Sequence, residues 1–176
     1  MHDAQVRGAQ AATPSPSTPS PSTPLASTPL PSTSLPSPPS QRAEPSTPAE
    51  IVDAYLSLLM VPDPASARRF VAPDLRIRFT GGREMRDPAE CSAFNATRYK
   101  WVKKRFERTE VVAGGTDEET VVYNIGTLHG EWPDGTPFEG NRYVDRYVLR
   151  KGQIAQMDVW NDSAERMLVR AGLLAD

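Results

Sequence analysis

Hydrophobic and polar residues alternate along residues 141–150, which read "NRYVDRYVLR". This alternation predicts a β-strand with one buried face, because successive side chains of a strand point to opposite sides. Two tyrosines would share one face with Asp145, while Arg142, Arg146 and Arg150 would share the other. Burying three arginines is far more costly than burying one carboxyl. We therefore predict that Asp145 points inward and that the arginines face water.

Helical patterns open the patterned part of the chain. Thr47 can cap a helix, Pro48 suits its first position, and Glu50 stands where a capping-box partner is expected. With apolar residues at helical spacing behind them, these signals predict a helix from about 48 to 60. Residues 65–72 read as a short second helix that ends at Pro73.

Residues 74–82, "DLRIRFTGG", alternate as a half-buried strand that ends in a Gly-Gly turn. Apolar residues at helical spacing then predict a third helix over 88–105. The basic run "KWVKKRFER", residues 100–108, would be a solvated face of that helix.

Strand patterns dominate the remainder. We expect strands over 108–115, 119–132, 138–150 and 153–161, and a last helix over 163–174 that Gly172 would terminate. Helices segregated from an antiparallel sheet define an α+β fold. We expect a cone-shaped, strongly bent antiparallel sheet, closed by three helices around a cavity.

Composition divides the 176 residues into two parts. Twelve of the 18 prolines precede residue 49, and residues 13–40 contain neither an aromatic nor a charged residue. Such a segment cannot bury enough apolar surface to fold, so residues 1–46 are predicted to be a disordered Pro/Ser/Thr-rich tail. It would serve as a spacer or as a docking peptide for a proline-binding domain. Residues 47–176 would form one domain.

Charge and cysteine content narrow the class of protein. The net charge is −2 without a basic block, which disfavours nucleic acid as a partner. The sequence shows neither a transmembrane-length apolar run nor a secretory signal, and its single cysteine, Cys91, suits a reducing compartment. We therefore expect a cytoplasmic protein with no membrane partner. One histidine and one cysteine in the domain cannot build a zinc site, and neither a metal nor a cofactor is expected.

Several short motifs carry a resemblance. The segments "AYLSLL", "FVAPDLRIRF", "DGTPFE", "YVDRY" and "GQI" follow one another as in the nuclear transport factor 2-like superfamily. The chain resembles most the SnoaL-like polyketide cyclases and ketosteroid isomerases of that superfamily, from about Pro48 to its end. The resemblance implies a cavity for a small hydrophobic molecule and a homodimer formed through the convex face of the sheet.

The resemblance also implies roles at matching positions. Tyr55 stands at the tyrosine position and Asp145 at the aspartic-acid position with which ketosteroid isomerases hydrogen-bond a developing oxyanion. The general base of those isomerases falls on Phe79, which cannot move a proton. The base of the cyclases falls near Val159, and a slip by one residue would offer Asp158. Both familiar bases are absent at their matching positions.

The residues themselves suggest chemistry and an alternative for each. On an apolar concave face Asp145 would tend to stay protonated and donate a hydrogen bond to a carbonyl or enolate oxygen; otherwise it only satisfies a buried tyrosine or backbone group. His129 could shuttle protons. A turn at Asp134–Gly135 would pair Leu128 with Asn141 and place His129 on the face of the sheet opposite to that of Asp145. A bulge near Gly130 would instead place both residues on the same face.

The predicted catalytic residues are thus Asp145, Tyr55 and His129. The predicted pocket lining comprises Phe79, Tyr99, Asn141, Tyr143, Tyr147, Met157, Val159 and Asn161. Two functions remain open. One is a cofactor-free isomerase or cyclase acting on a small hydrophobic carbonyl compound. The other is a non-catalytic ligand-binding or dimerisation module of the same fold.

Overall fold

The computed structural model describes residues 44–116 and 118–175. The predicted tail, residues 1–46, lies almost wholly outside the described residues. The described helices are α1 (Pro48–Met60), α2 (Pro64–Ala67), the 3-10 turn η1 (Arg68–Phe70), α3 (Pro88–Arg98) and α4 (Ser163–Arg170). The described strands are β1 (Val71–Phe79), β2 (Glu84–Met85), β3 (Trp101–Ala113), β4 (Glu119–Glu131), β5 (Pro137–Arg150) and β6 (Gln153–Asn161).

The strands form one sheet in the order β2-β1-β6-β5-β4-β3. All neighbouring strands are antiparallel except β1 and β6, which pair in parallel. The expected antiparallel sheet therefore contains one parallel pair. A parallel pair needs a long crossover connection, and the α3 and β3–β5 segments that separate β1 from β6 in sequence supply it.

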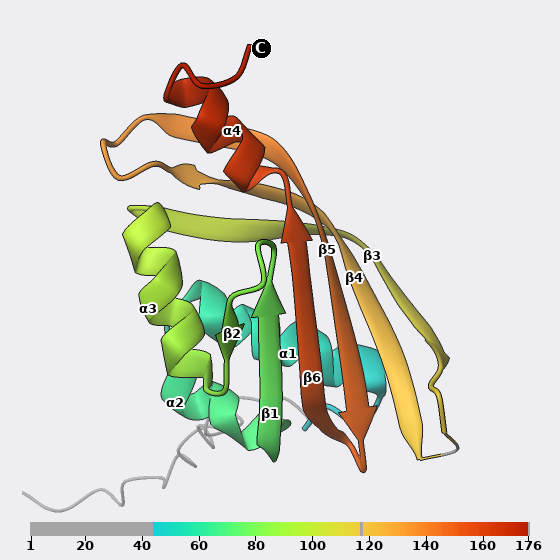
Figure 1. Ribbon diagram of the computed structural model, residues 1–176. Coiled ribbons are helices and arrows are strands. Elements are labelled where there is room, and N and C mark those ends of the chain that lie inside the picture. The colour runs from blue at the N-terminus through green and yellow to red at the C-terminus, as the bar shows by residue number, and fades with distance from the viewer. Residues whose placement is uncertain (1–43, 117, 176) are drawn as a thin grey trace, which may run out of the picture. The chain divides into compact units, whose positions relative to one another are not determined.

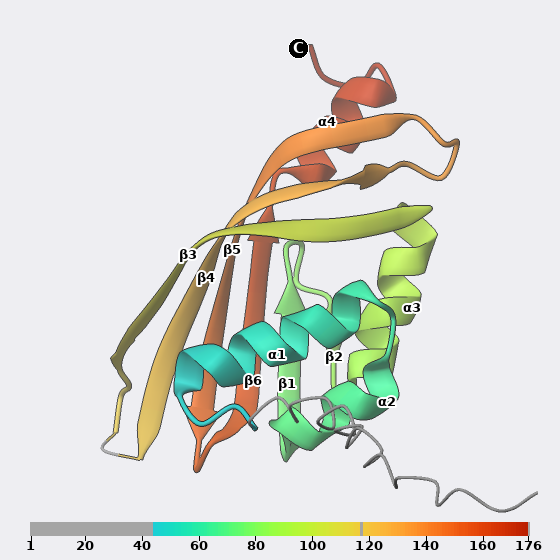
Figure 2. The same cartoon turned by 180° about the vertical axis from the view of Figure 1, so that it is seen from behind.

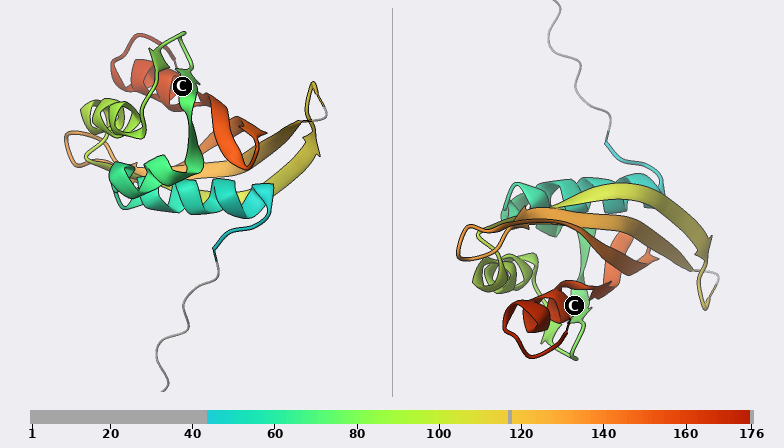
Figure 3. Two further views of the ribbon diagram at one scale, coloured as in Figure 1. Left: turned by 90° about the horizontal axis from the view of Figure 1, so that it is seen from below. Right: turned by 90° about the horizontal axis from the view of Figure 1, so that it is seen from above.

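The sheet is strongly curled but not closed. Figure 1 shows β3, β4 and β5 bending over their length, and Figure 2 shows α1 lying across the concave side. Irregular register interrupts four strand pairs, and such bulges bend a strand and increase its twist. We call the concave side the inner face and the convex side the outer face. Figure 3 shows α1 and α3 on the inner side and α4 beyond one end of the sheet.

Helix α1 has the predicted bounds and the predicted capping box. The Thr47 hydroxyl accepts a hydrogen bond from the Glu50 backbone N–H at 3.2 Å, and the Glu50 carboxylate accepts one from the Thr47 backbone N–H at 3.0 Å. The backbone donors of Thr47 and Ser46 hold the pKa of Glu50 at about 2. The helix buries Tyr55 and Leu56 against the sheet.

The prediction of a third helix over 88–105 is wrong beyond Arg98. The chain turns to an extended conformation at Tyr99, and β3 begins at Trp101 and pairs along its length with β4. Continuous pairing with a neighbouring strand outweighed the weak local helical spacing. The basic run from 100 to 108 therefore lies on a strand and not on a solvated helix.

Two smaller boundaries also differ. The short second helix gives way to a 3-10 turn and ends at Phe70, so Pro73 lies inside β1 rather than stopping a helix. The last helix ends at Arg170, and Gly172 follows with a φ of 69° that suits glycine at a helix end. The core fills the space between α1, α3 and the inner face, and the predicted buried face of β1 contributes Leu75, Ile77 and Phe79 to it.

Candidate functional site

Asp145 lies at the centre of the inner face. Its side chain is 0% exposed, and it stands beside Asn124 of β4 and Val159 of β6. On the same strand Arg142 and Arg150 point outward and are exposed. The alternation of β5 therefore places the carboxyl inside and the arginines outside.

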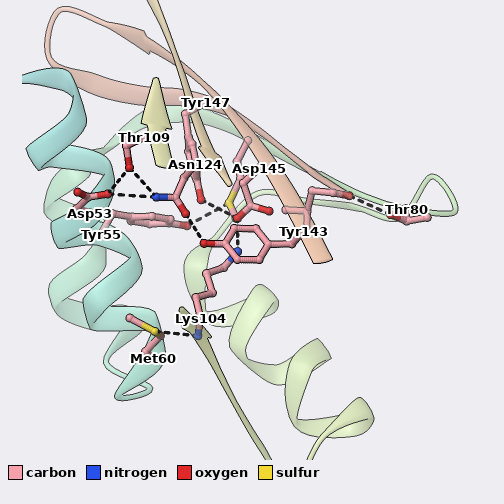
Figure 4. Close-up of polar contacts among 12 residues, drawn as sticks. Asp53, Tyr55, Met60, Thr80, Lys104, Thr109, Asn124, Tyr143, Asp145 and Tyr147 are labelled. Atoms are coloured by element: carbon pink, nitrogen blue, oxygen red, sulfur yellow. Dashed lines mark hydrogen bonds and ion pairs between the residues drawn. The ribbon is translucent and has the colours of Figure 1, made fainter. Parts of the chain in front are cut away.

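Lys104 of β3 reaches across the inner face to this carboxyl. Its Nζ lies 2.5 Å from Asp145 Oδ2, and its side chain is 16% exposed. The same ammonium lies 3.5 Å from the ring centroid of Tyr143, which provides a cation–π contact (Figure 4). The site therefore contains a largely enclosed ion pair. The sequence predicts a neutral acid at this position, whereas the structure places the Lys104 ammonium beside the carboxyl as a hydrogen-bond donor.

The two oxygens of Asp145 have unequal surroundings. Oδ2 accepts hydrogen bonds from Lys104 and from the Tyr147 hydroxyl, the latter at 3.0 Å. Oδ1 is buried and has no hydrogen-bond partner among residues 44–116 and 118–175. Buried carboxylate oxygens are nearly always hydrogen-bonded. Oδ1 is therefore a buried acceptor that no described protein group uses.

Burial shifts the pKa of the groups around Asp145. Desolvation lowers the pKa of Lys104, and the Asp145 carboxylate opposes this effect. Desolvation, and then the charge of Asp145, raises the pKa of Tyr147 well above its ordinary value, so its hydroxyl stays a neutral donor. Burial raises the pKa of Tyr55 in the same way. Lys104 is therefore the cation of this cluster, and Tyr55 and Tyr147 keep their own protons.

A pocket opens beside the ion pair. Its volume is about 70 Å³, which accommodates only two or so water molecules, since each occupies about 30 Å³ in the liquid. Larger ligands would displace its flexible side chains, of which Met60, Lys104 and Met157 are three. The lining residues are Leu56, Leu59, Met60, Phe79, Cys91, Asn95, Tyr99, Val102, Lys103, Lys104, Leu128, Asp145, Met157, Val159 and Asn161. Apart from the ion pair and a few polar groups, the wall is apolar.

A hydrogen-bonded chain supports Tyr143 from behind. Its hydroxyl donates to Asn124 Oδ1 at 2.6 Å. The Asn124 amide donates in turn to Thr109 at 3.0 Å and to Asp53 of α1 at 3.3 Å (Figure 4). Because Asn124 is fully buried and both ends of its amide are bonded, Tyr143 is held in one position. The ring beneath Lys104 is therefore fixed by residues of α1, β3 and β4.

The structure brings part of the predicted set to the pocket. Phe79, Tyr99, Met157, Val159 and Asn161 line it. The other predicted lining residues are buried but do not line it: these are Asn141, Tyr143 and Tyr147.

Tyr55 packs behind the pocket wall. Its ring meets that of Tyr147 edge-on at 6.3 Å between centroids, and its hydroxyl lies 3.9 Å from Met157 Sδ. It contacts a residue of the wall without lining the pocket itself. Tyr55 therefore supports the site from the second layer.

His129 lies on the outer face. It stands opposite Lys103 in the sheet and contacts the Trp101 ring edge-on, and it does not line the pocket. The alternative, a bulge near Gly130, is present, but its extra residue belongs to β5: Glu139 and Gly140 together oppose His129. The facing of His129 therefore stays as the Leu128–Asn141 pairing predicts.

Asp158 also lies on the outer face. Its carboxylate bonds Arg78 at 3.2 Å, Arg146 at 3.2 Å and Gln156 at 2.7 Å. The last strand has the register in which Met157 and Val159, not Asp158, face inward. Asp158 therefore cannot replace a base in the pocket.

Lys104 is the main residue that sequence reasoning missed. Its assignment to a helix concealed the alternation of Val102, Lys104 and Phe106, which are less exposed than their neighbours in β3. Reading that segment as a strand would have placed Lys104 on an apolar face. The other missed lining residues come mainly from α1, α3 and β3: Leu56, Leu59, Met60, Cys91, Asn95, Val102, Lys103 and Leu128.

Three further observations concern Cys91, metal ligands and the described helices. Burial raises the pKa of Cys91 to about 12, so its thiol is not an activated nucleophile. Among the described residues, no three His, Cys, Asp or Glu side chains gather as metal ligands would. None of the described helices combines the length and the apolar character that a membrane crossing requires.

Comparison with known proteins identifies the fold. No protein-family model and no curated protein matches the sequence. A nuclear transport factor 2-like protein from Burkholderia thailandensis matches the structure with a TM-score of 0.55 and 18% identity, over 74% of this chain and 99% of that one. One of unknown function from Burkholderia pseudomallei matches with a TM-score of 0.54 and 19% identity, over 72% and 96%.

A third solved structure, TerC co-crystallised with polyporic acid, matches with a TM-score of 0.53 and 18% identity, over 69% of this chain and 96% of that one. All three matches span the described domain and nearly all of the other protein. Identities this low establish the architecture and leave the reaction open. The described domain has the nuclear transport factor 2-like fold, as the sequence motifs indicated.

Proposed function

We propose that the domain binds a small apolar carbonyl compound and catalyses cofactor-independent proton transfer next to the carbonyl group. The observation that carries this proposal is the enclosed Lys104–Asp145 pair with its unused Oδ1. A mostly apolar pocket with a few convergent polar groups is the usual form of a small-molecule site. The pair supplies a cation and a hydrogen-bond acceptor within one such pocket.

The two groups divide the chemistry between them. Lys104 Nζ would donate to the carbonyl oxygen and stabilise the negative charge that develops there. One preorganised donor of this kind contributes about 2.7–4 kcal/mol. Asp145 Oδ1 would take a proton from the adjacent carbon and return it to the same or a neighbouring carbon, which gives exchange or isomerisation. The sequence predicts that a neutral Asp145 donates a hydrogen bond to the oxyanion. In this proposal Lys104 is the donor and Asp145 is the base.

The small cavity is consistent with a compact ligand. A ligand of a few heavy atoms, such as cyclopentanone, would still require Met60 or Met157 to move, and unbranched thioether side chains adapt readily. The apolar wall from Phe79, Leu128 and Val159 would then exclude water from the ion pair. Exclusion of water strengthens the electrostatic interaction on which the proposed step depends.

The test is deuterium exchange at the α-carbons of cyclopentanone in D₂O, followed by proton NMR. The wild-type protein should accelerate exchange over buffer, and Asp145→Asn should not. Saturable binding without exchange would overturn the catalytic part of the proposal. If a panel of small apolar ketones showed no binding and no exchange, the whole proposal would be overturned.

One observation favours the second candidate function, a non-catalytic binding module. Phe79 occupies the position of the isomerase base and lines the pocket, where it packs edge-on against Phe94 at 5.4 Å. A pocket built only to hold a ligand needs no base there. Binding without exchange in the experiment above is the result that this function predicts.

The expected homodimer remains a prediction. Ile125, Val144 and Trp160 stand side by side in register across the outer face, and the latter two are exposed. A second copy covering this apolar row would bury it. Sedimentation of the wild-type protein and of Trp160→Glu measures this: the prediction requires a dimer that the substitution weakens.

A further inference from the structure

The burial of the Lys104 amine suits a nucleophile as well as a cation. Its amine lies inside an apolar pocket, and burial lowers its pKa from the ordinary lysine value. Lysines desolvated in this way are the ones that attack carbonyl groups. The other described lysines are exposed, so Lys104 is the single enclosed amine of the described domain.

We propose that Lys104 forms a Schiff base with the carbonyl ligand of the pocket. This inference rests on the proposed function, since it concerns the same ligand and the same ion pair. It goes beyond that function because it makes the lysine a covalent partner rather than an electrostatic one.

The step balances within the ion pair. Asp145 accepts a proton from the Lys104 ammonium, and the neutral amine attacks the carbonyl carbon to form a carbinolamine. Asp145 then returns the proton to the carbinolamine oxygen, which leaves as water while the C=N bond forms. The net result is a ketone or aldehyde plus a lysine ammonium giving an iminium ion plus water. No oxidant, reductant or metal is consumed.

The surroundings favour this product. The iminium ion keeps the positive charge of the ammonium, so it retains its ion pair with Asp145 and its contact with the Tyr143 ring. A protonated Schiff base acidifies the neighbouring carbon more strongly than a neutral carbonyl does. The unused Asp145 Oδ1 stands on the same carboxyl and can take that proton.

The Asp53–Asn124–Tyr143 chain serves the same purpose. It fixes the ring against which Lys104 lies, and so limits the positions open to the amine. A nucleophile held near its reacting position loses less entropy on attack. Asn124 is thus a positioning residue for Lys104.

The experiment traps the Schiff base on the full chain. The protein is incubated at about pH 7 with butanal and sodium cyanoborohydride, which reduces an iminium ion to a stable N-butyl-lysine. Intact mass and peptide mapping then give the rate at each lysine. Lys104 should be butylated several-fold faster than exposed Lys100 and Lys151, and cyclopentanone should slow only Lys104. Butylation of Lys104 no faster than of Lys100 would overturn the inference.

A pair of variants separates the inference from the proposed function. Lys104→Arg keeps the positive charge but cannot form a Schiff base, whereas Lys100→Met removes only an exposed lysine paired with Glu131. The inference predicts that Lys104→Arg loses cyclopentanone exchange and Lys100→Met does not. If Lys104→Arg retains exchange that Asp145→Asn abolishes, the Schiff base is refuted and the electrostatic function stands. If the folded wild-type protein shows neither exchange nor trapping, both fail.

Discussion

Two buried carboxylates on neighbouring strands differ in how completely they are bonded. Asp158 of β6 is 4% exposed on the outer face, and both of its oxygens accept hydrogen bonds, from two arginines and a glutamine. Asp145 of β5 is 0% exposed on the inner face, and one of its oxygens accepts none among the described residues. The bonded carboxylate joins strands, whereas the incompletely bonded one belongs to a residue that lines a pocket.

The partners of Asp158 show why it is structural. Arg78 of β1 and Arg146 of β5 are its neighbours in register on either side, so the carboxylate ties three strands together. Both arginines reach solvent and keep their charges hydrated. Asp145 instead pairs with a single enclosed cation, Lys104, and this ion pair lies beside a pocket.

The largest expected effect concerns activity. Asp145→Asn should lower α-proton exchange in cyclopentanone by about 100-fold or more, the usual contribution of a general base. Asp158→Asn is the matched control, because it makes the same chemical change on the other face and should leave exchange near the wild-type level. Proton NMR measures both. An equal loss in the two variants would show that the faces do not differ in function.

The next effect concerns stability. Lys104→Met should lower the free energy of unfolding by about 3–5 kcal/mol, because it leaves the Asp145 carboxylate buried without its cation. Combining Lys104→Met with Asp145→Leu should restore much of this loss, since no charge is then left unpaired. Urea denaturation of the two single variants and the double variant gives the coupling energy. Additive losses would show that the two side chains do not interact as an ion pair.

A smaller loss is expected on the outer face. Asp158→Asn should lower the free energy of unfolding by about 1–3 kcal/mol, because its charge-assisted hydrogen bonds weaken while Arg78 can turn to water. Thermal unfolding compares it with Lys104→Met. If the Asp158 variant were the less stable of the two, the outer cluster would dominate the stability of the sheet, contrary to the comparison drawn above.

The smallest effect is a dependence on alkaline pH. The pKa of Tyr147 is raised in the folded protein by burial and by Asp145. In the unfolded chain a tyrosine titrates near pH 10, so the stabilising contribution is fully present below about pH 10 and is lost as the pH rises above it. Tyr147→Phe should therefore show a shallower decline of stability above that pH than the wild-type protein. Urea denaturation at a series of alkaline pH values measures this decline. If the free energy of unfolding fell with pH as steeply in Tyr147→Phe as in the wild-type protein, the assigned burial would be contradicted.

The sequence predicted the face of Asp145 because strand alternation is a local property. The arginines of β5 sufficed to turn Asp145 inward. The predicted pairing of Leu128 with Asn141 is also found, but the turn alone does not set it, because Glu131 pairs with Pro137 beside the turn and a bulge then shifts the register. The capping box of α1 was likewise readable from three adjacent residues. These two features depend on a few neighbouring residues and were predicted correctly, whereas the local helical spacing of residues 99–105 was misleading.

The ion pair could not be predicted in the same way, because its two members lie 41 residues apart and on non-adjacent strands. Only the curl of the sheet brings β3 across to β5, and the segment containing Lys104 had been assigned to a helix. The parallel pairing of β1 with β6 was missed for a similar reason, since it depends on the whole intervening chain. Long-range partners, rather than local preferences, decide the chemistry of this pocket.

The most direct test of the central claim, that Asp145 Oδ1 is held ready for a ligand, is a crystal structure of the protein with cyclopentanone. We predict that the ketone occupies the pocket with its oxygen within hydrogen-bond distance of Lys104 Nζ, or with its former carbonyl carbon bonded to that nitrogen, and with an α-carbon in contact with Asp145 Oδ1. A structure in which the ketone binds elsewhere while Oδ1 is bonded to a protein group would contradict the account.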